Sequence, residues 1–141
     1  MKKLISLTIA SGLALAITGC AAQPTVADAM KIDVKDVCNV EKNGIAKVLA
    51  TAKAYNPIAV KKQHEFMRFG ATTSAYIKGI EAAIKSGSKT AHVVGKKKKI
   101  QKYDLAMATH RACSFAVRAV QLGEESKSTY RLVIPGDGFK Y

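Results

Sequence analysis

The side chains best suited to covalent or metal chemistry in this sequence are three thiols and three imidazoles. They are Cys20, Cys38, Cys113, His64, His92 and His110. His110 and Cys113 are three residues apart, so a helix would place them on one face. A structural zinc site uses four ligands, and it often takes them from C-x-x-C or H-x-x-x-H pairs. The sequence contains neither pair, so it does not supply the further ligands. The chain also lacks H-E-x-x-H, G-x-S-x-G and a glycine-rich phosphate loop, so it predicts no enzyme, metal or cofactor.

The N-terminal segment ends at the first of these thiols. Lys2 and Lys3 precede an apolar run from Leu4 to Ile17, which is the layout of a secretory signal. The run has fourteen residues, and a membrane-spanning helix needs about 20. We therefore expect a cleaved signal rather than a permanent membrane span.

The end of this segment, Leu15-Ala16-Ile17-Thr18-Gly19-Cys20, resembles the lipobox of bacterial lipoproteins. The resemblance implies a signal peptide at residues 1–19, a diacylglycerol on the Cys20 thiol and a further acyl chain such as palmitate on the new amino terminus. Enteric-type sorting retains proteins with Asp after the cysteine at the inner membrane, so Ala21 implies the outer membrane. Residues 21–29 are small and polar and predict a tether, which leaves 30–141 as one periplasmic or surface domain.

The two other cysteines predict a disulfide. If Cys20 carries lipid, Cys38 and Cys113 remain as an even pair in an oxidising compartment. The alternative is a metal site that uses both thiols together with His110. We favour the disulfide, because a fourth ligand is not evident.

The composition is strongly basic. The chain has 23 Lys plus Arg against 10 Asp plus Glu, and loss of Lys2 and Lys3 with the signal would leave a charge of +11, from 21 cations and 10 anions. A basic surface attracts anionic partners. Because an exported protein rarely meets nucleic acid, we expect lipid phosphate, acidic glycan or an acidic protein instead. Lys96, Lys97, Lys98 and Lys99 are a candidate patch, and a merely solvated turn is the alternative.

Apolar residues at helical spacing predict three long elements. The first begins at Asp33 and ends near Tyr55, and Asn43-Gly44 either bends it or divides it into two short helices. The second begins at Asn56-Pro57 and runs to about Lys85, with an aromatic stripe facing the core. The third covers 100–122, stops at Gly123 and carries His110 on its buried face. The stripe of the second helix includes Phe66, Phe69, Tyr76 and Ile80.

Two segments predict strands. Thr90–Val94 is rich in β-branched residues, and Thr129–Ile134 precedes a Pro135-Gly136 turn signal. The two could pair with each other, or the second could offer its edge to another protein. The fold class is therefore mainly α: a small bundle of three to four helices with one disulfide, in which a short two-stranded β element is an option.

These observations favour a lipid-anchored binding or structural protein of the cell envelope. It would attach to the membrane through Cys20 and recruit or occlude a protein partner there. Pilotin lipoproteins of secretion systems are similar in size, anchor and paired cysteines, and that analogy implies a groove for a peptide. A protective exclusion or immunity lipoprotein is the other alternative, and it implies an exposed rigid face or loop.

Overall fold

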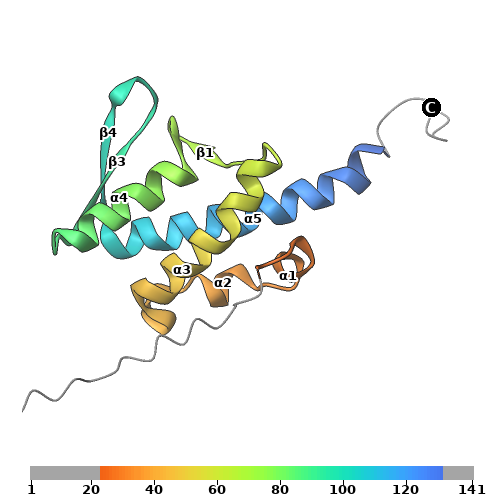
Figure 1. The fold of residues 1–141 in the computed structure, drawn as a ribbon, viewed down its shortest axis with the longest axis horizontal. Coiled ribbons are helices and arrows are strands. Elements are labelled where there is room, and N and C mark those ends of the chain that lie inside the picture. The colour runs from red at the N-terminus through yellow and green to blue at the C-terminus, as the bar shows by residue number, and fades with distance from the viewer. Residues whose placement is uncertain (1–22, 132–141) are drawn as a thin grey trace, which may run out of the picture.

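The computed structural model describes residues 23–131, which form five α-helices and two short β-hairpins (Figure 1). This confirms the mainly α fold class with a small β component. The signal segment, Cys20 and residues 132–141 lie outside the described residues. The elements are α1 (Val26–Met30), α2 (Val34–Val37), α3 (Val40–Lys61), β1 (Met67–Arg68), β2 (Ala71–Thr72), α4 (Thr73–Lys85), β3 (Thr90–Val94), the 3-10 turn η1 (Lys96–Lys98), β4 (Ile100–Asp104) and α5 (Leu105–Arg131).

Helix α5 is the centre of the domain and contacts each of the other four helices. Small side chains permit this close packing, because alanines recur every four residues along its buried face. Those fully buried alanines are Ala108, Ala112 and Ala116, and α3 brings Ala52 and Ala59 to the same core. Figure 1 shows both hairpins on one side of α5 and helices α1 and α2 on the other.

Helix α3 is bent where the sequence predicts, but it does not end where the sequence predicts. Gly44 has φ 76° and ψ 155°, so it makes the kink expected at Asn43-Gly44. The boundary expected at Asn56-Pro57 is wrong, because α3 continues through Pro57 to Lys61. Proline removes one helix hydrogen bond, yet burial of Asn56 and Ala59 on the same face keeps this stretch helical.

Part of the predicted second helix, residues 67–72, is a hairpin instead. Strands β1 and β2 pair Met67 with Thr72, and Phe69-Gly70 forms the turn. Both turn residues have positive φ, 51° and 79°, as a two-residue type I′ turn requires. Helix α4 therefore begins only at Thr73, where the Thr72 hydroxyl accepts a hydrogen bond from the Ala75 N–H.

The second hairpin confirms one predicted strand and corrects its partner. Thr90–Val94 is β3, but it pairs with β4 rather than with Thr129–Ile134. The helix expected from Ile100 begins at Leu105, and the Asp104 carboxylate accepts hydrogen bonds from the first helical N–H groups. The alternating burial of β4, with Gln101 and Tyr103 inward, explains why this stretch is extended.

Gly123 does not end α5, which continues to Arg131. The expected strand is therefore wrong for Thr129 to Arg131, and its remaining residues lie outside the described part of the chain. Gly123 has a packing role instead. A Cβ atom at this position would lie 2.0 Å from the His64 Nδ1 atom, so the missing side chain admits the imidazole against α5.

The predicted tether is shorter than expected, because its second half is folded. Thr25 and Asp28 form a capping box at the start of α1. Ala29 is fully buried, and Gln121 Nε2 donates hydrogen bonds to the carbonyl groups of Ala29 and Ile32, at 2.9 and 3.0 Å. The folded domain thus begins at Thr25 rather than at Met30.

The predicted disulfide is present and links the end of α2 to α5. Cys38 and Cys113 are both fully buried, with 5.5 Å between their Cα atoms. His110 is exposed rather than buried as expected, and its Nδ1 atom lies 2.8 Å from the Cys38 carbonyl oxygen. The pairing excludes a metal site made of both thiols and His110, because disulfide sulfurs are not thiolate ligands.

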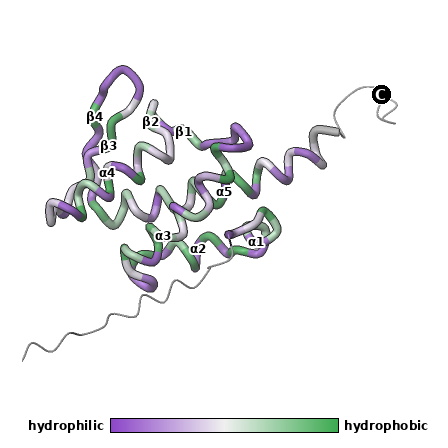
Figure 2. Tube along the Cα trace, viewed as in Figure 1, coloured by the Kyte–Doolittle hydropathy of each residue, from purple (hydrophilic) through white to green (hydrophobic). Residues whose placement is uncertain are grey.

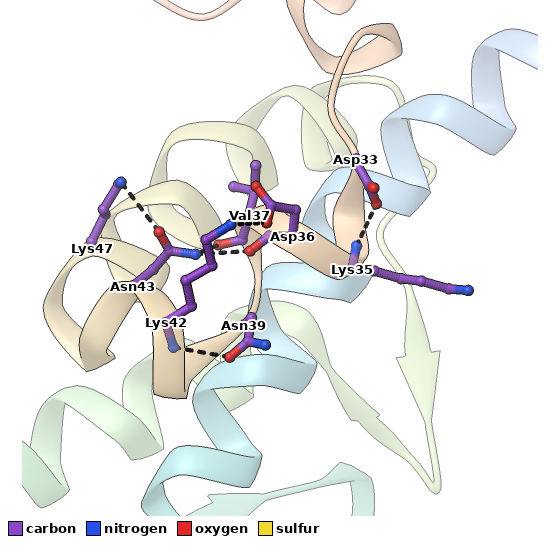
Figure 3. A network of polar contacts seen from close by, with 8 residues as sticks. All are labelled: Asp33, Lys35, Asp36, Val37, Asn39, Lys42, Asn43 and Lys47. Atoms are coloured by element: carbon purple, nitrogen blue, oxygen red, sulfur yellow. Dashed lines mark hydrogen bonds and ion pairs between the residues drawn. The ribbon is translucent and has the colours of Figure 1, made fainter.

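Polar contacts hold the α2–α3 corner beside the disulfide (Figure 3). The Asp33 carboxylate accepts from the Lys35 N–H at 2.9 Å, and the Asn39 side chain accepts from the Lys42 N–H at 3.0 Å. Asn43 Nδ2 donates to the Asp36 carbonyl at 2.8 Å, and Asp36 also pairs with the Lys42 ammonium group. These contacts cap the N-termini of α2 and α3, so Cys38, which lies between the two helices, is held in a defined position.

Candidate functional site

The turns of the two hairpins lie against each other and form one surface. The Lys96 N–H donates to the Gly70 carbonyl at 2.6 Å, and Gln101 Nε2 donates to the Phe69 carbonyl at 2.7 Å. A Cβ atom at Gly95 would lie 3.0 Å from the Gly70 oxygen, so glycine permits this approach. We call residues 67–70 and 94–100 together the hairpin surface.

The hairpin surface holds unfavourable backbone conformations. Four non-glycine residues of the described chain have positive φ, and three of them belong to this surface: Phe69, Lys97 and Lys98. A left-handed conformation at such a residue costs on the order of 1 kcal/mol. The hydrogen bonds between the two turns oppose this cost, and side chains held in this way mark a candidate functional region.

Large apolar side chains are exposed on the hairpin surface. Phe69 is 70% exposed, Ile100 59% and Val94 53%. Val94 and Ile100 are paired directly across β3 and β4, so they form one exposed apolar pair. The Arg68 guanidinium lies 5.1 Å from the centre of the Phe69 ring, within cation–π distance. Apolar and cationic groups are therefore interleaved here.

The same surface carries a concentrated positive charge. Residues 82–103 contain seven lysines and no carboxylate, and Lys96–Lys99 lie exposed at the tip of the second hairpin. Figure 2 shows the strongly hydrophilic tip between β3 and β4. In the described part of the chain, the ion pairs all involve other lysines: Lys42–Asp36, Lys53–Glu81, Lys62–Glu124 and Lys127–Glu124.

An aromatic cluster forms the base of both hairpins. Phe66 stacks on Phe115 with 4.7 Å between ring centres, and Tyr76 stacks on Tyr103 at 5.4 Å. Tyr76 also meets the edge of Phe115, so the three elements α4, β4 and α5 share one cluster. The predicted aromatic core stripe is thus confirmed for Tyr76 and wrong for Phe69, which is exposed.

Tyr76 is a strongly perturbed acid at the centre of this aromatic cluster. Its hydroxyl group is buried without a hydrogen-bond partner. Burial raises the pKa of Tyr76 to about 12, and the neighbouring Tyr103 acts in the same direction. The phenol therefore stays neutral at physiological pH, and its role is to anchor the hairpins.

Hollows also lie beside and beyond the hairpin surface. A groove of about 430 Å³ runs between α4 and β3, where Lys78 and His92 line an apolar floor that includes Gly79. A second hollow of about 300 Å³ lies beside the disulfide and is lined in part by Met107 and His110. Within residues 23–131, no three His, Cys, Asp or Glu side chains are grouped so that they could hold a metal ion. No helix in that range is long and apolar enough to cross a membrane.

The structure brings the predicted cysteine pair together and adds neighbouring residues to the predicted lysine patch. Cys38 and Cys113 are bonded, whereas Cys20 lies outside the described residues. Lys96–Lys99 are joined by residues that the sequence did not single out for a site, chiefly Arg68, Phe69 and Ile100. The Phe69-Gly70 dipeptide, between residues that can form strands, was the one sequence signal for the first turn.

Comparison with known proteins adds no relative. No family model, no curated protein and no solved structure matches this chain.

Proposed function

We propose that this chain is a lipid-anchored binding protein of the bacterial cell envelope, held at the outer membrane through Cys20. The hairpin surface carries the binding part of the proposal, because it presents exposed apolar side chains among lysines that lack described carboxylate partners. The Leu15–Cys20 segment supports the anchor, and the Cys38–Cys113 disulfide is in keeping with an oxidising compartment.

The mechanism is localisation without a catalytic step. Acyl chains concentrate the domain at one surface, so a partner of modest intrinsic affinity is still bound. A single acyl chain binds a membrane only weakly, so a stable anchor needs more than one. The lipobox resemblance implies several acyl chains on Cys20. The two turns are already tied together by the Lys96–Gly70 and Gln101–Phe69 hydrogen bonds, which reduces the entropy lost when a partner binds.

One observation favours a pilotin-like assembly helper as a second candidate. The groove between α4 and β3 has an apolar floor, and one of its walls is helix α4. Such a groove suits an extended or helical peptide of a secretion or conjugation machine. The paired hairpin turns favour the protective alternative instead, because they form a rigid protrusion that could block another molecule.

Labelled palmitate tests the anchor. The wild-type protein should incorporate the label and fractionate with outer membranes, whereas Cys20→Ser should remain unlabelled. A wild type that never incorporates palmitate in a lipoprotein-processing bacterium would overturn the anchor.

Photo-crosslinking tests the binding surface. A crosslinker at Phe69 in the acylated protein should capture a partner more strongly than one at Leu122, which is 49% exposed on α5. Capture that favours Ser74 or Lys78 would point to the groove between α4 and β3. Equal capture at every position would contradict a dedicated binding surface.

A further inference from the structure

We infer that the hairpin surface binds directly to an anionic phospholipid bilayer. Phe69 and Ile100 enter the headgroup layer, and Lys96–Lys99 contact lipid phosphates. This deepens the proposed function by naming the class of anionic partner. Direct binding to a bilayer does not require an acyl chain on Cys20. The lipid anchor and the bilayer contact of the hairpin surface are therefore tested by different experiments.

Charge complementarity is the first argument. The seven lysines of residues 82–103 face solvent with no carboxylate in the same stretch, and four of them share one hairpin tip. A lysine near an anionic leaflet contributes about 1 kcal/mol, which corresponds to roughly fivefold in affinity. The effect extends over about one Debye length, some 8–10 Å, so the lysines of one tip act together.

The exposed apolar side chains are the second argument. Phe69, Val94 and Ile100 are each more than half exposed, although the domain has a well-packed core. At a membrane interface such side chains lie near the boundary of the acyl chains, while neighbouring lysines extend toward the headgroups. Interleaved apolar and basic groups at the tips of turns match this layered environment.

Shape and residue type decide between a bilayer and an acidic protein. A stable protein interface buries about 800 Å² on each partner and needs a complementary surface. Two narrow turns offer little flat area, whereas a fluid bilayer deforms around them. The run is also made of lysine, a compact and flexible charge, rather than arginine, which favours fixed bidentate pairs.

The first experiment measures vesicle binding by the unacylated chain, residues 21–141, with its disulfide formed. The core side chains lie between Ala29 and Val120, so this chain keeps them all. It should bind phosphatidylglycerol vesicles and bind phosphatidylcholine vesicles far more weakly. Changing Lys96–Lys99 to glutamine should reduce affinity by at least about tenfold, less so at high salt.

A matched control separates local from total charge. Changing Lys31, Lys35, Lys47 and Lys61 to glutamine removes the same charge from exposed positions on or next to helices α1–α3. This variant should lose less than about threefold in affinity, because none of its four lysines belongs to the hairpin surface. An equal loss in both variants would overturn the inference in favour of general electrostatic attraction.

A tryptophan reporter tests penetration. The chain contains no tryptophan, so Phe69→Trp supplies a single probe at the tip, and Leu122→Trp supplies one on α5. With phosphatidylglycerol vesicles, emission from the Phe69→Trp variant should shift to the blue and resist an aqueous quencher, while the Leu122→Trp variant should not change.

The inference would also be overturned by no binding to anionic vesicles, by no emission shift at position 69, or by equal shifts at positions 69 and 122. A further contrary outcome is binding of an acidic protein or anionic glycan through Lys96–Lys99 without vesicle binding, which would assign this surface to that macromolecule. Circular dichroism should be the same for every variant. None of these results depends on whether palmitate labels Cys20.

Discussion

The helical side of the domain and the hairpin side use charge in opposite ways. Around α1–α3 three carboxylates are engaged: Asp28 and Asp33 cap helices, and Asp36 pairs with Lys42. The hairpin surface instead carries lysines without described carboxylate partners, strained turn residues and exposed Phe69. One side is arranged for stability and the other retains unsatisfied groups, which is the arrangement expected of a binding surface. The following predictions test that contrast.

Removal of the disulfide should have the largest effect on stability. The Cys38→Ala/Cys113→Ala variant loses a crosslink that closes a loop of 75 residues. In the chain-entropy model that loss lowers the free energy of unfolding by roughly 4–5 kcal/mol. Urea denaturation monitored by circular dichroism measures the change. A loss below about 1 kcal/mol would show that the packing of α2 and α5 holds the helical side without the bond.

Alkaline pH should weaken the base of the hairpins. Burial raises the pKa of Tyr76 to about 12, while a free tyrosine titrates near 10. Between these values the unfolded chain releases its proton and the folded chain keeps it, so the free energy of unfolding falls as pH rises. The total loss is about 2–3 kcal/mol.

Tyr76→Phe is the matched control for that pH effect. Denaturation at pH 9 and above should show a flatter profile for this variant, because the titrating group is gone. Tyr103→Phe tests the neighbouring ring, which contributes less to the shift. Identical profiles for wild type and Tyr76→Phe would remove Tyr76 as the cause.

Gly79→Ala should loosen the hairpin side selectively. A Cβ atom at this position would lie 2.6 Å from the His92 backbone oxygen, and backbone cannot swing aside as a side chain does. Overpacking of this kind costs about 1–3 kcal/mol. Hydrogen exchange should quicken in β3 and β4 before α1–α3. A uniform change across the chain would mean that the two sides do not open separately.

Relief of strain should have the smallest effect, and it should be favourable. Lys97 has φ 61°, so Lys97→Gly should raise the free energy of unfolding by up to about 1 kcal/mol. Lys97→Ala removes the same charge but keeps the left-handed conformation, and it should show no such gain. Thermal denaturation of the two variants side by side provides the measurement. Equal stabilities would mean that charge, rather than backbone strain, dominates at this turn.

Local rules predicted the elements whose signals lie within a few residues. Asp33 caps α2, Gly44 makes the kink, and Thr90–Val94 forms a strand, each for the reason that its own sequence provides. The disulfide also followed from counting cysteines. These features depend on backbone preferences and redox chemistry, which a sequence displays directly.

The Lys96–Lys99 patch was predicted, but its junction with the first hairpin could not be, because the contacts that make it join residues distant in sequence. Phe66, Phe69 and Thr73 have helical spacing by coincidence, so the sequence predicts the first hairpin as part of a helix that begins at Asn56-Pro57. What makes it a hairpin is tertiary: Lys96 donates to Gly70, and the Phe66 ring stacks on Phe115.

Gly123 illustrates the same limit. A glycine near the end of a helical pattern usually indicates a stop. Here His64, far away in sequence, occupies the space that a side chain would take.

Helix α1 places the start of the folded domain against α5, on the side away from both hairpins (Figure 1). From Cys20 to the cap at Thr25 the chain spans five residues, which reach at most about 17 Å. A lipid on Cys20 would therefore orient the domain. The hairpin surface would face away from the membrane that holds the lipid and toward a second surface. The acylated protein would then act as a linker between two surfaces, and it should cluster anionic vesicles that the unacylated chain merely coats.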